Sequence, residues 1–136
     1  MKGKYGSSLL MKACEEGHLQ KVQYLISKGA DINHQNDLND TPLIYACEYG
    51  NIGIVEYLVN HGASINIYNK FHDTPLISAY NNNHFNVVMY LISKGADVNA
   101  TDIFGETVLM KAFKKRNSKI LNYLFENNAN KRNIIN

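Results

Sequence analysis

The stretch Asp40-Thr-Pro-Leu-Ile-Tyr-Ala-Cys-Glu-Tyr-Gly-Asn51, followed by Gly62-Ala63, decides the fold. A near-copy, Asp73-Thr-Pro-Leu-Ile-Ser-Ala-Tyr-Asn-Asn-Asn-His84 followed by Gly95-Ala96, begins 33 residues later. Weaker copies stand one period to either side, so the same residue types align four times: Ser8, Thr41, Thr74 and Thr107, then Ala13, Ala46, Ala79 and Ala112, then Leu25, Leu58, Leu91 and Leu124. A fixed period of this length indicates stacked supersecondary units, each unable to bury its apolar face alone.

The start of each copy predicts a short helix. Thr41 is a good N-cap, and Pro42 suits the first helical position because its missing N–H costs nothing there. Leu43, Ala46 and Cys47 then give this helix one apolar stripe before the turn at Gly50 and Asn51.

A second helix is predicted after that turn. Its apolar positions repeat the helical spacing at Ile52, Val55, Leu58 and Val59. Gly62 is placed where this helix ends, since glycine adopts the left-handed backbone of a C-cap without a side-chain penalty, and Asn128 takes the same place in the last copy. The polar, turn-rich residues 63–73 predict an extended loop.

These motifs resemble ankyrin repeats. The resemblance rests on the two Thr-Pro-Leu starts, on Gly17-His18, on Asp102-Ile-Phe-Gly-Glu-Thr107, and on endings such as Gly62-Ala-Ser-Ile-Asn66. It covers nearly the whole chain as four units, approximately residues 3–35, 36–68, 69–101 and 102–134. It implies a single all-α domain over residues 1–136, an α-solenoid of stacked helix-turn-helix units with extended, hairpin-like loops.

One departure from the family pattern recurs in all four units. The histidine that usually follows Thr-Pro-Leu is replaced by Met11, Ile44, Ile77 and Met110. We expect apolar packing at this position in place of the usual side-chain hydrogen bonds.

Composition narrows the class of protein. The 136 residues are 45% hydrophobic, which is ample for a continuous core, and carry a formal net charge of +2. That charge is too small to indicate nucleic acid or an anionic membrane as the partner. No apolar run approaches the roughly 20 residues of a membrane span, and the N-terminus has no signal-peptide core. We expect an intracellular, cytoplasmic location; a nuclear one is also compatible.

The sequence offers no catalytic or metal-binding constellation. Cys14 and Cys47 occupy one position in adjacent units, where helices about 8–10 Å apart are too distant for a disulfide, so we predict buried thiols. The five histidines lack metal-ligand spacing, and the loop carboxylates lack a partner base or nucleophile. We therefore predict no enzyme activity, no cofactor, no metal and no small-molecule substrate.

Two further ladders follow the period of 33. Tyrosines recur on the second helices, where packing on neighbouring aliphatic side chains is the favoured interpretation: Tyr24, Tyr57, Tyr90 and Tyr123. Asparagines recur where each loop begins, and we expect their side chains to satisfy local backbone groups: Asn33, Asn66 and Asn99. In the family this asparagine can be hydroxylated, but nothing in the sequence indicates that modification here.

The resemblance implies that a partner protein docks on a concave side built from loop tips and first helices. Phe104 stands one position before the loop glycine Gly105, and the same position carries a large apolar residue in every unit: Tyr5, Leu38, Phe71 and Phe104. Exposed side chains of this kind would form an interaction patch with aromatic anchors. The same residues could instead pack loop against loop as part of the scaffold, and both interpretations stay open.

A gradient of charge follows the ends of the first helices. The paired positions run Glu15-Glu16, Glu48-Tyr49, Asn81-Asn82 and Lys114-Lys115, from acidic through neutral to basic. An ordinary solvated surface explains such charges, and cations are favoured near helix C-termini in any case. If the gradient serves recognition, it sets the orientation of a partner more than its affinity.

The sequence thus predicts a non-catalytic, monomeric protein–protein interaction module. The predicted partner-binding residues are Tyr5, Leu38, Phe71, Phe104, Tyr49, Glu16 and Lys115. Two alternatives remain: a structural spacer within a longer ankyrin array, and a nucleic-acid binder acting through Lys111 to Arg116.

Overall fold

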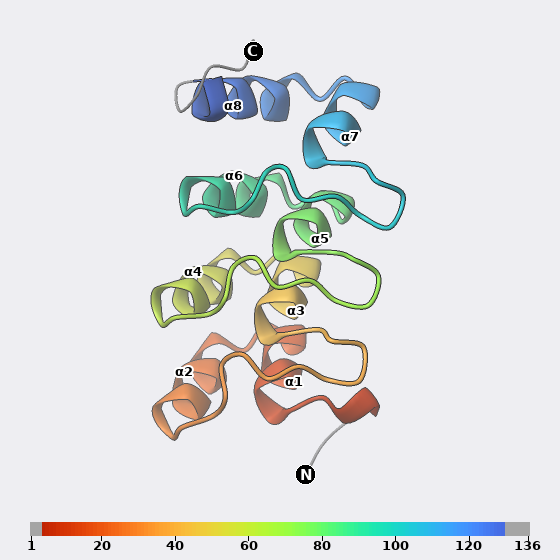
Figure 1. Cartoon of the computed structure of the whole chain (residues 1–136). Coiled ribbons are helices and arrows are strands. Elements are labelled where there is room, and N and C mark those ends of the chain that lie inside the picture. Colours follow the sequence, from red (N-terminus) through yellow and green to blue (C-terminus); the bar gives the residue numbers. More distant parts are fainter. Residues whose placement is uncertain (1–3, 130–136) are drawn as a thin grey trace.

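The computed structural model describes residues 4–129 and contains eight α-helices in four antiparallel pairs (Figure 1). A short 3-10 helix, η1 (Lys4–Gly6), precedes them, and no strand occurs between residues 4 and 129. The helices are α1 (Leu9–Glu16), α2 (Leu19–Ser27), α3 (Pro42–Tyr49), α4 (Ile52–Asn60), α5 (Pro75–Asn81), α6 (Phe85–Ser93), α7 (Val108–Lys114) and α8 (Ser118–Ala129).

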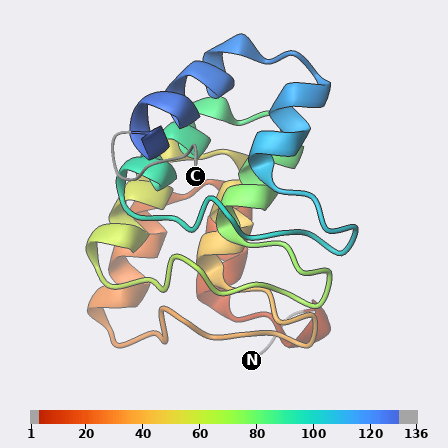
Figure 2. The ribbon, with the colours of Figure 1, turned by 45° about the horizontal axis from the view of Figure 1, so that its top comes forward.

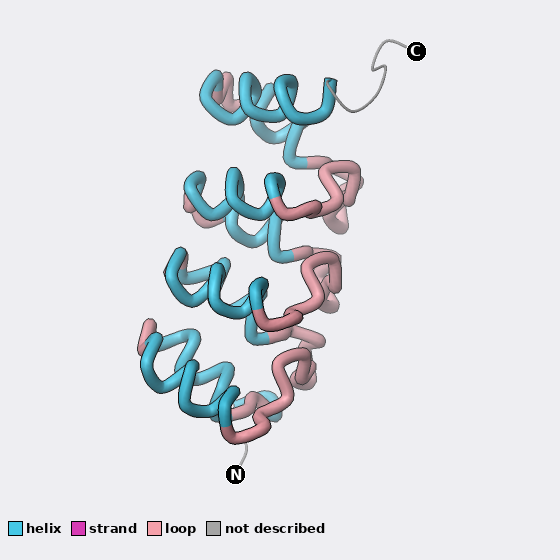
Figure 3. Tube along the Cα trace, turned by 90° about the vertical axis from the view of Figure 1, so that its left-hand side faces the viewer, coloured by secondary structure: helices cyan, strands magenta, loops and turns pink. Residues whose placement is uncertain are grey.

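The four pairs stack in chain order into an elongated solenoid. The first helices of the pairs (α1, α3, α5, α7) form one column and the second helices (α2, α4, α6, α8) form the other (Figures 1 and 2). The long loops between pairs project together to one side of both columns (Figure 3). The predicted all-α solenoid of helix-turn-helix units is confirmed.

The predicted helix starts are confirmed in all four units. In each, a Ser or Thr hydroxyl accepts a hydrogen bond from the backbone N–H three residues later, at 3.1–3.2 Å: Ser8, Thr41, Thr74 and Thr107. These caps satisfy amide groups that the first helical turn leaves unpaired.

The ends of the second helices also follow the prediction, with one exception. Gly29, Gly62 and Gly95 adopt left-handed backbone with φ of 92°, 95° and 97°. Helix α8 instead runs through Asn128 to Ala129, so the prediction that Asn128 ends this helix is wrong. Left-handed backbone costs more for asparagine than for glycine, so asparagine stops a helix less strongly.

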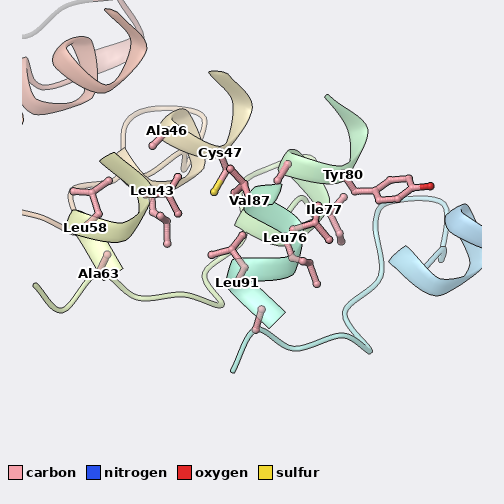
Figure 4. Close-up of a cluster of buried hydrophobic side chains, with 14 of the residues drawn as sticks. Leu43, Ala46, Cys47, Leu58, Ala63, Leu76, Ile77, Tyr80, Val87 and Leu91 are labelled. Atoms are coloured by element: carbon pink, nitrogen blue, oxygen red, sulfur yellow. The ribbon is translucent and has the colours of Figure 1, made fainter. Parts of the chain in front are cut away.

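The core is a continuous strip between the two columns of helices. Leu43, Ala46 and Cys47 from α3 face Leu58 from α4, and the next unit repeats the arrangement (Figure 4). Cys14 and Cys47 are buried free thiols, as predicted, and burial raises the pKa of Cys14 to about 12. A thiol with so high a pKa is protonated and inert at neutral pH.

Apolar packing at the position of the missing histidine is confirmed in the first three units. Met11, Ile44 and Ile77 are at most 1% exposed. The prediction is wrong for Met110, which is 50% exposed. Within residues 4–129 no further helix pair stacks on the outer face of α7, whereas the next unit covers the other three positions.

The two ladders behave differently from one another. Tyr57, Tyr90 and Tyr123 pack against the core as predicted, but Tyr24 is mostly exposed, with the Lys28 ammonium 5.6 Å from its ring centroid. The asparagines bond across units instead of locally: the Oδ1 of Asn33 accepts from Ser64 N and that of Asn66 from Asp97 N, both at 2.8 Å. These bonds therefore tie the first two loops to the following units, and the corresponding partner of Asn99, residue 130, lies outside the described residues.

Replacing Arg116 by glycine should increase stability by about 0.5–1 kcal/mol. Arg116 has φ of 55° in the turn between α7 and α8, where Gly17 and Gly50 stand in the first two units. Left-handed backbone costs roughly 1–2 kcal/mol for an L-residue, and the greater freedom of glycine in the unfolded chain offsets part of the gain. Urea denaturation measures the change. Arg116→Ala removes the same charge but keeps the strain, so an equal gain from alanine would contradict the argument.

Candidate functional site

Each loop tip is a tight hairpin held by its own hydrogen bonds. The backbone of Asn69 donates to Asp73 O at 3.0 Å, and the Asn69 Oδ1 accepts from the N–H groups of Phe71 and Asp73 at 2.9 and 3.0 Å. Asn36 and Asp102 do the same in the loops before and after. The predicted hairpin-like loops are thus confirmed, and they fix the direction of the tip side chains.

The structure separates the members of the predicted apolar stripe. Tyr5, Phe71 and Phe104 are 50%, 53% and 84% exposed, whereas Leu38 is half-buried. The large rings at these three tips are therefore at least half exposed to solvent. At Leu38 the side chain is less exposed, as the loop-packing interpretation expects.

The three binding residues predicted from the charge gradient, Glu16, Tyr49 and Lys115, lie at or just after the ends of the first helices. Glu16 and Tyr49 are exposed at the ends of α1 and α3, and Lys115 directly follows α7. Burial raises the pKa of Glu48, and the carboxylates of Asp40, Glu15 and Asp73 raise it further. The acidic part of the gradient is therefore a group of interacting carboxylates, and it extends as far as unit 3.

The basic part of the gradient is partly neutralised. Lys111 Nζ lies 2.7 Å from Asp102 Oδ2 and 3.8 Å from Glu106 Oε1, and Lys114 pairs with Glu106. Lys115 and Arg116 form no ion pair with any residue from 4 to 129. Half of the basic cluster is thus engaged within unit 4, which weakens the nucleic-acid alternative.

The joint between units 3 and 4 lacks the loop contact that the other joints have. Asp37 N donates to Tyr5 O at 2.7 Å, and Lys70 N donates to Leu38 O at 2.9 Å. The corresponding pair, Ile103 N and Phe71 O, forms no backbone hydrogen bond in the part of the chain that the structure describes. The last two loop tips are consequently not tied to each other.

A side-chain contact changes at the same joint. The Asn36 Nδ2 donates to Ser7 Oγ at 3.0 Å, and the Asn69 Nδ2 donates to Asp40 Oδ1 at 2.8 Å. The third pair is Asp102 and Asp73, and two carboxylates cannot make this bond.

Asp102 stands where the two earlier units have asparagine, and the pKa values of Asp102 and Asp73 are shifted in opposite directions. Burial acts to raise the pKa of Asp102, but hydrogen bonds, first from Lys111, hold it below its ordinary value. Burial raises the pKa of Asp73, and the Asp102 carboxylate raises it further, while the charges of Lys111 and His72 offset part of the increase. The Asp73 carboxylate accepts no hydrogen bond from residues 4–129, and its half-buried position leaves it open to solvent.

The turn contact is also missing between units 3 and 4. In the previous joint the His84 ring lies over Gly50, and its Nε2–H donates to Glu48 O at 3.0 Å. One unit later Asn83 takes the place of that glycine and Asn117 takes the place of His84, and no hydrogen bond joins these two turns among residues 4–129. Tyr80, in the position of the two cysteines, packs against Phe85 with centroids 5.3 Å apart and points toward α7 (Figure 4).

These changes open a groove between α5 and α7, which we call the unit 3–4 groove. It consists of two adjoining cavities of about 620 and 780 Å³ that share Asn81, Glu106 and Lys111. The smaller is lined by Phe71, Asp73, Asn81, Asp102, Ile103, Phe104, Glu106 and Lys111. The larger adds Tyr80, Asn83, Phe85, Lys114, Lys115 and Asn117.

The unit 3–4 groove unites three of the predicted binding residues, Phe71, Phe104 and Lys115, while the other four line neither cavity. Sequence reasoning missed Asp73, Asp102 and Tyr80 as groove residues. The available signal was departure from the repeat itself: Asp for Asn at residue 102 and Tyr for Cys at residue 80. Unit 4 is attached through the shared core, to which α7 contributes Val108 and Ala112, and through the second helices, where the Tyr123 hydroxyl donates to Met89 O at 3.0 Å.

Comparison with known proteins agrees with this architecture. A family model described as ankyrin repeats, in three copies, matches residues 1–69 and 64–134, while the structure has four helix pairs. A search of curated proteins finds no match. In the described part of the chain no helix is long and apolar enough to cross a membrane, and no group of three metal-ligating side chains gathers. The chain therefore belongs to the ankyrin-repeat family.

Proposed function

We propose that this chain is a non-catalytic module that binds a partner protein on the concave side formed by its loop tips and first helices. Ankyrin repeats are generally protein–protein interaction modules. The observation that carries the proposal is the exposure of the large rings of Tyr5, Phe71 and Phe104, at three of the four positions of the tip ladder. Exposed apolar groups in a line favour a binding surface, since solvent exposure of such rings is otherwise unfavourable.

Rigid presentation is the proposed mechanism. Hydrogen bonds accepted by the side chains of Asn36, Asn69 and Asp102 hold the tips in place before any partner arrives, so little conformational entropy is lost on binding. The acidic ends of α1 and α3 and the free Lys115 then orient the partner along a monomeric solenoid.

Replacing Leu38, Phe71 and Phe104 together by serine should abolish partner binding. The test is affinity capture from a lysate of the source cell with the wild-type chain and the variant as paired baits, read by mass spectrometry with a nuclease-treated control. Leu38 is half-buried, so a second variant, Phe71→Ser with Phe104→Ser, leaves the scaffold contact in place. We expect the double variant to keep the wild-type helical circular dichroism and Tm.

Retention of the same proteins by wild type and both variants would contradict the proposal. A large loss of Tm in the double variant would instead assign the two rings to the scaffold. If nuclease removed every captured protein, the nucleic-acid alternative would take precedence.

A second candidate function, a spacer within a longer array, is favoured by the outer face of unit 4. Three apolar side chains on this face of α7 are 37–70% exposed: Leu109, Met110 and Phe113. The residues at the corresponding positions of α1, α3 and α5 are buried. A further unit would cover this face. Sedimentation equilibrium distinguishes the candidates, because an uncovered repeat interface drives concentration-dependent association, which the concave surface alone does not require.

A further inference from the structure

We propose that the unit 3–4 groove seats an extended segment of the partner protein, with an arginine side chain paired to Asp73 between Phe71 and Phe104. This inference rests on the proposed function and names the chemistry of the partner. No other joint of the described chain has lost its loop, side-chain and turn contacts together.

The walls of the groove match an extended segment. Phe71 O and Ile103 N stand on the two loops that border the smaller cavity, and neither makes the loop-to-loop bond seen at the other joints. A free acceptor on one loop and a free donor on the other can pair with the backbone of an inserted segment, as an exposed strand edge does. The inserted segment would supply the contacts that the chain itself omits here.

The charges of the smaller cavity select a cation. Its lining contains three carboxylates and one ammonium group, Lys111. Lys111 is engaged by Asp102 and Glu106, and Lys114 adds a second cation to Glu106. Asp73 is the remaining carboxylate: it is half-buried and accepts no hydrogen bond from residues 4–129. Burial and the Asp102 and Asp40 carboxylates hold its pKa above its ordinary value, and they outweigh the charges of Lys111 and His72, which lower the pKa.

Arginine fits this arrangement better than lysine. A guanidinium group can donate two parallel hydrogen bonds to one carboxylate, and its flat faces stack on aromatic rings. Phe71 and Phe104 line the same cavity as Asp73 and are the exposed rings of the loop tips. A cation beside such rings gains a further cation–π attraction.

The larger cavity continues the same path along the segment. The rings of Tyr80 and Phe85 contribute apolar surface to it, and Lys115 borders it without an ion pair inside residues 4–129. A large apolar side chain next to the arginine would lie on these two rings.

The test uses a display library of random twelve-residue peptides, selected on the immobilised full chain. We expect the enriched peptides to share an arginine next to a large apolar residue. Each is then synthesised with a fluorescent label, and its Kd is measured by anisotropy on three proteins: wild type, Asp73→Asn and Glu126→Gln. Glu126 is an exposed carboxylate on α8 outside both cavities, so its variant controls for the loss of one charge.

Asp73→Asn should weaken peptide binding at least tenfold, and Glu126→Gln less than twofold. Replacing the peptide arginine by citrulline, which has similar shape but no charge, should weaken binding to wild type by a similar factor. Asp73→Asn should also raise Tm, because the new amide can donate to Asp102 as Asn69 donates to Asp40. A loss of binding accompanied by higher stability cannot come from misfolding.

Three results would overturn the inference: no enriched peptide, enriched peptides without arginine, or equal binding to wild type and Asp73→Asn. A further comparison tests the proposed function separately. Peptides that bind the Asp73→Asn variant as well as wild type, but do not bind the Phe71→Ser, Phe104→Ser variant, would leave the concave surface as the binding site and contradict only the arginine pairing. Peptides that bind both variants as tightly as wild type would contradict both proposals.

Discussion

Replacing Leu58 by alanine should lower the free energy of unfolding by about 2–5 kcal/mol. Leu58 on α4 is fully buried, in the core strip beside Leu43 and Ala46 of the same unit. Removing its three terminal carbons loses transfer free energy and leaves a cavity that closely packed neighbours cannot fill. The loss is a large fraction of the stability of a domain of this size.

The repeat supplies a matched control for this variant. Leu25 occupies the same position in unit 1, but it is only half-buried, because no unit precedes it among the described residues. Leu25→Ala should therefore cost less than half as much as Leu58→Ala. Leu91, at the corresponding place in unit 3, is fully buried and should match Leu58.

Urea denaturation followed by circular dichroism measures all three variants. Equal losses for Leu25→Ala and Leu58→Ala would show that unit position does not control the cost, contrary to the additive unit and interface energies of a solenoid. A separate unfolding step in Leu58→Ala would instead show that the array has lost cooperativity.

Most of the fold follows from the sequence because each unit repeats the same local chemistry. A threonine hydroxyl at residue 41, a proline at residue 42 and a glycine at residue 62 act within a few residues, so their effects can be predicted without a structure. Four copies in one register then place the apolar stripes on common faces. Where that chemistry weakens, as at Asn128, the predicted helix end failed.

The candidate site could be predicted only in part, because it depends on relations between units. The apolar tip positions were visible in the sequence, but whether Leu38 or Phe104 is exposed depends on the neighbouring loop. The groove arises where contacts between units are missing, and no sequence motif marks the absence of a contact. Asp102 is an ordinary loop residue in its own unit, and its importance appears only when the structure sets it against Asp73.

Replacing Gly50 by alanine should lower the free energy of unfolding by about 2–4 kcal/mol. Gly50 has φ of +76° in the turn between α3 and α4, a conformation that costs an L-residue roughly 1–2 kcal/mol. A Cβ at this position would also lie 2.3 Å from the His84 ring. The ring must therefore move, and its hydrogen bond to Glu48 O, which joins units 2 and 3, would be lost.

Two comparisons separate the strain from the clash. Gly62→Ala has a similar positive φ of 95° but no atom within 4 Å of the new Cβ, so it should show the backbone cost alone. His84→Ala combined with Gly50→Ala removes the obstructing ring, so the double variant should be less destabilised than the sum of the single variants. Additive losses in urea denaturation would mean that the ring and the glycine are independent. Coupling would establish this turn as a contact that closes the second joint.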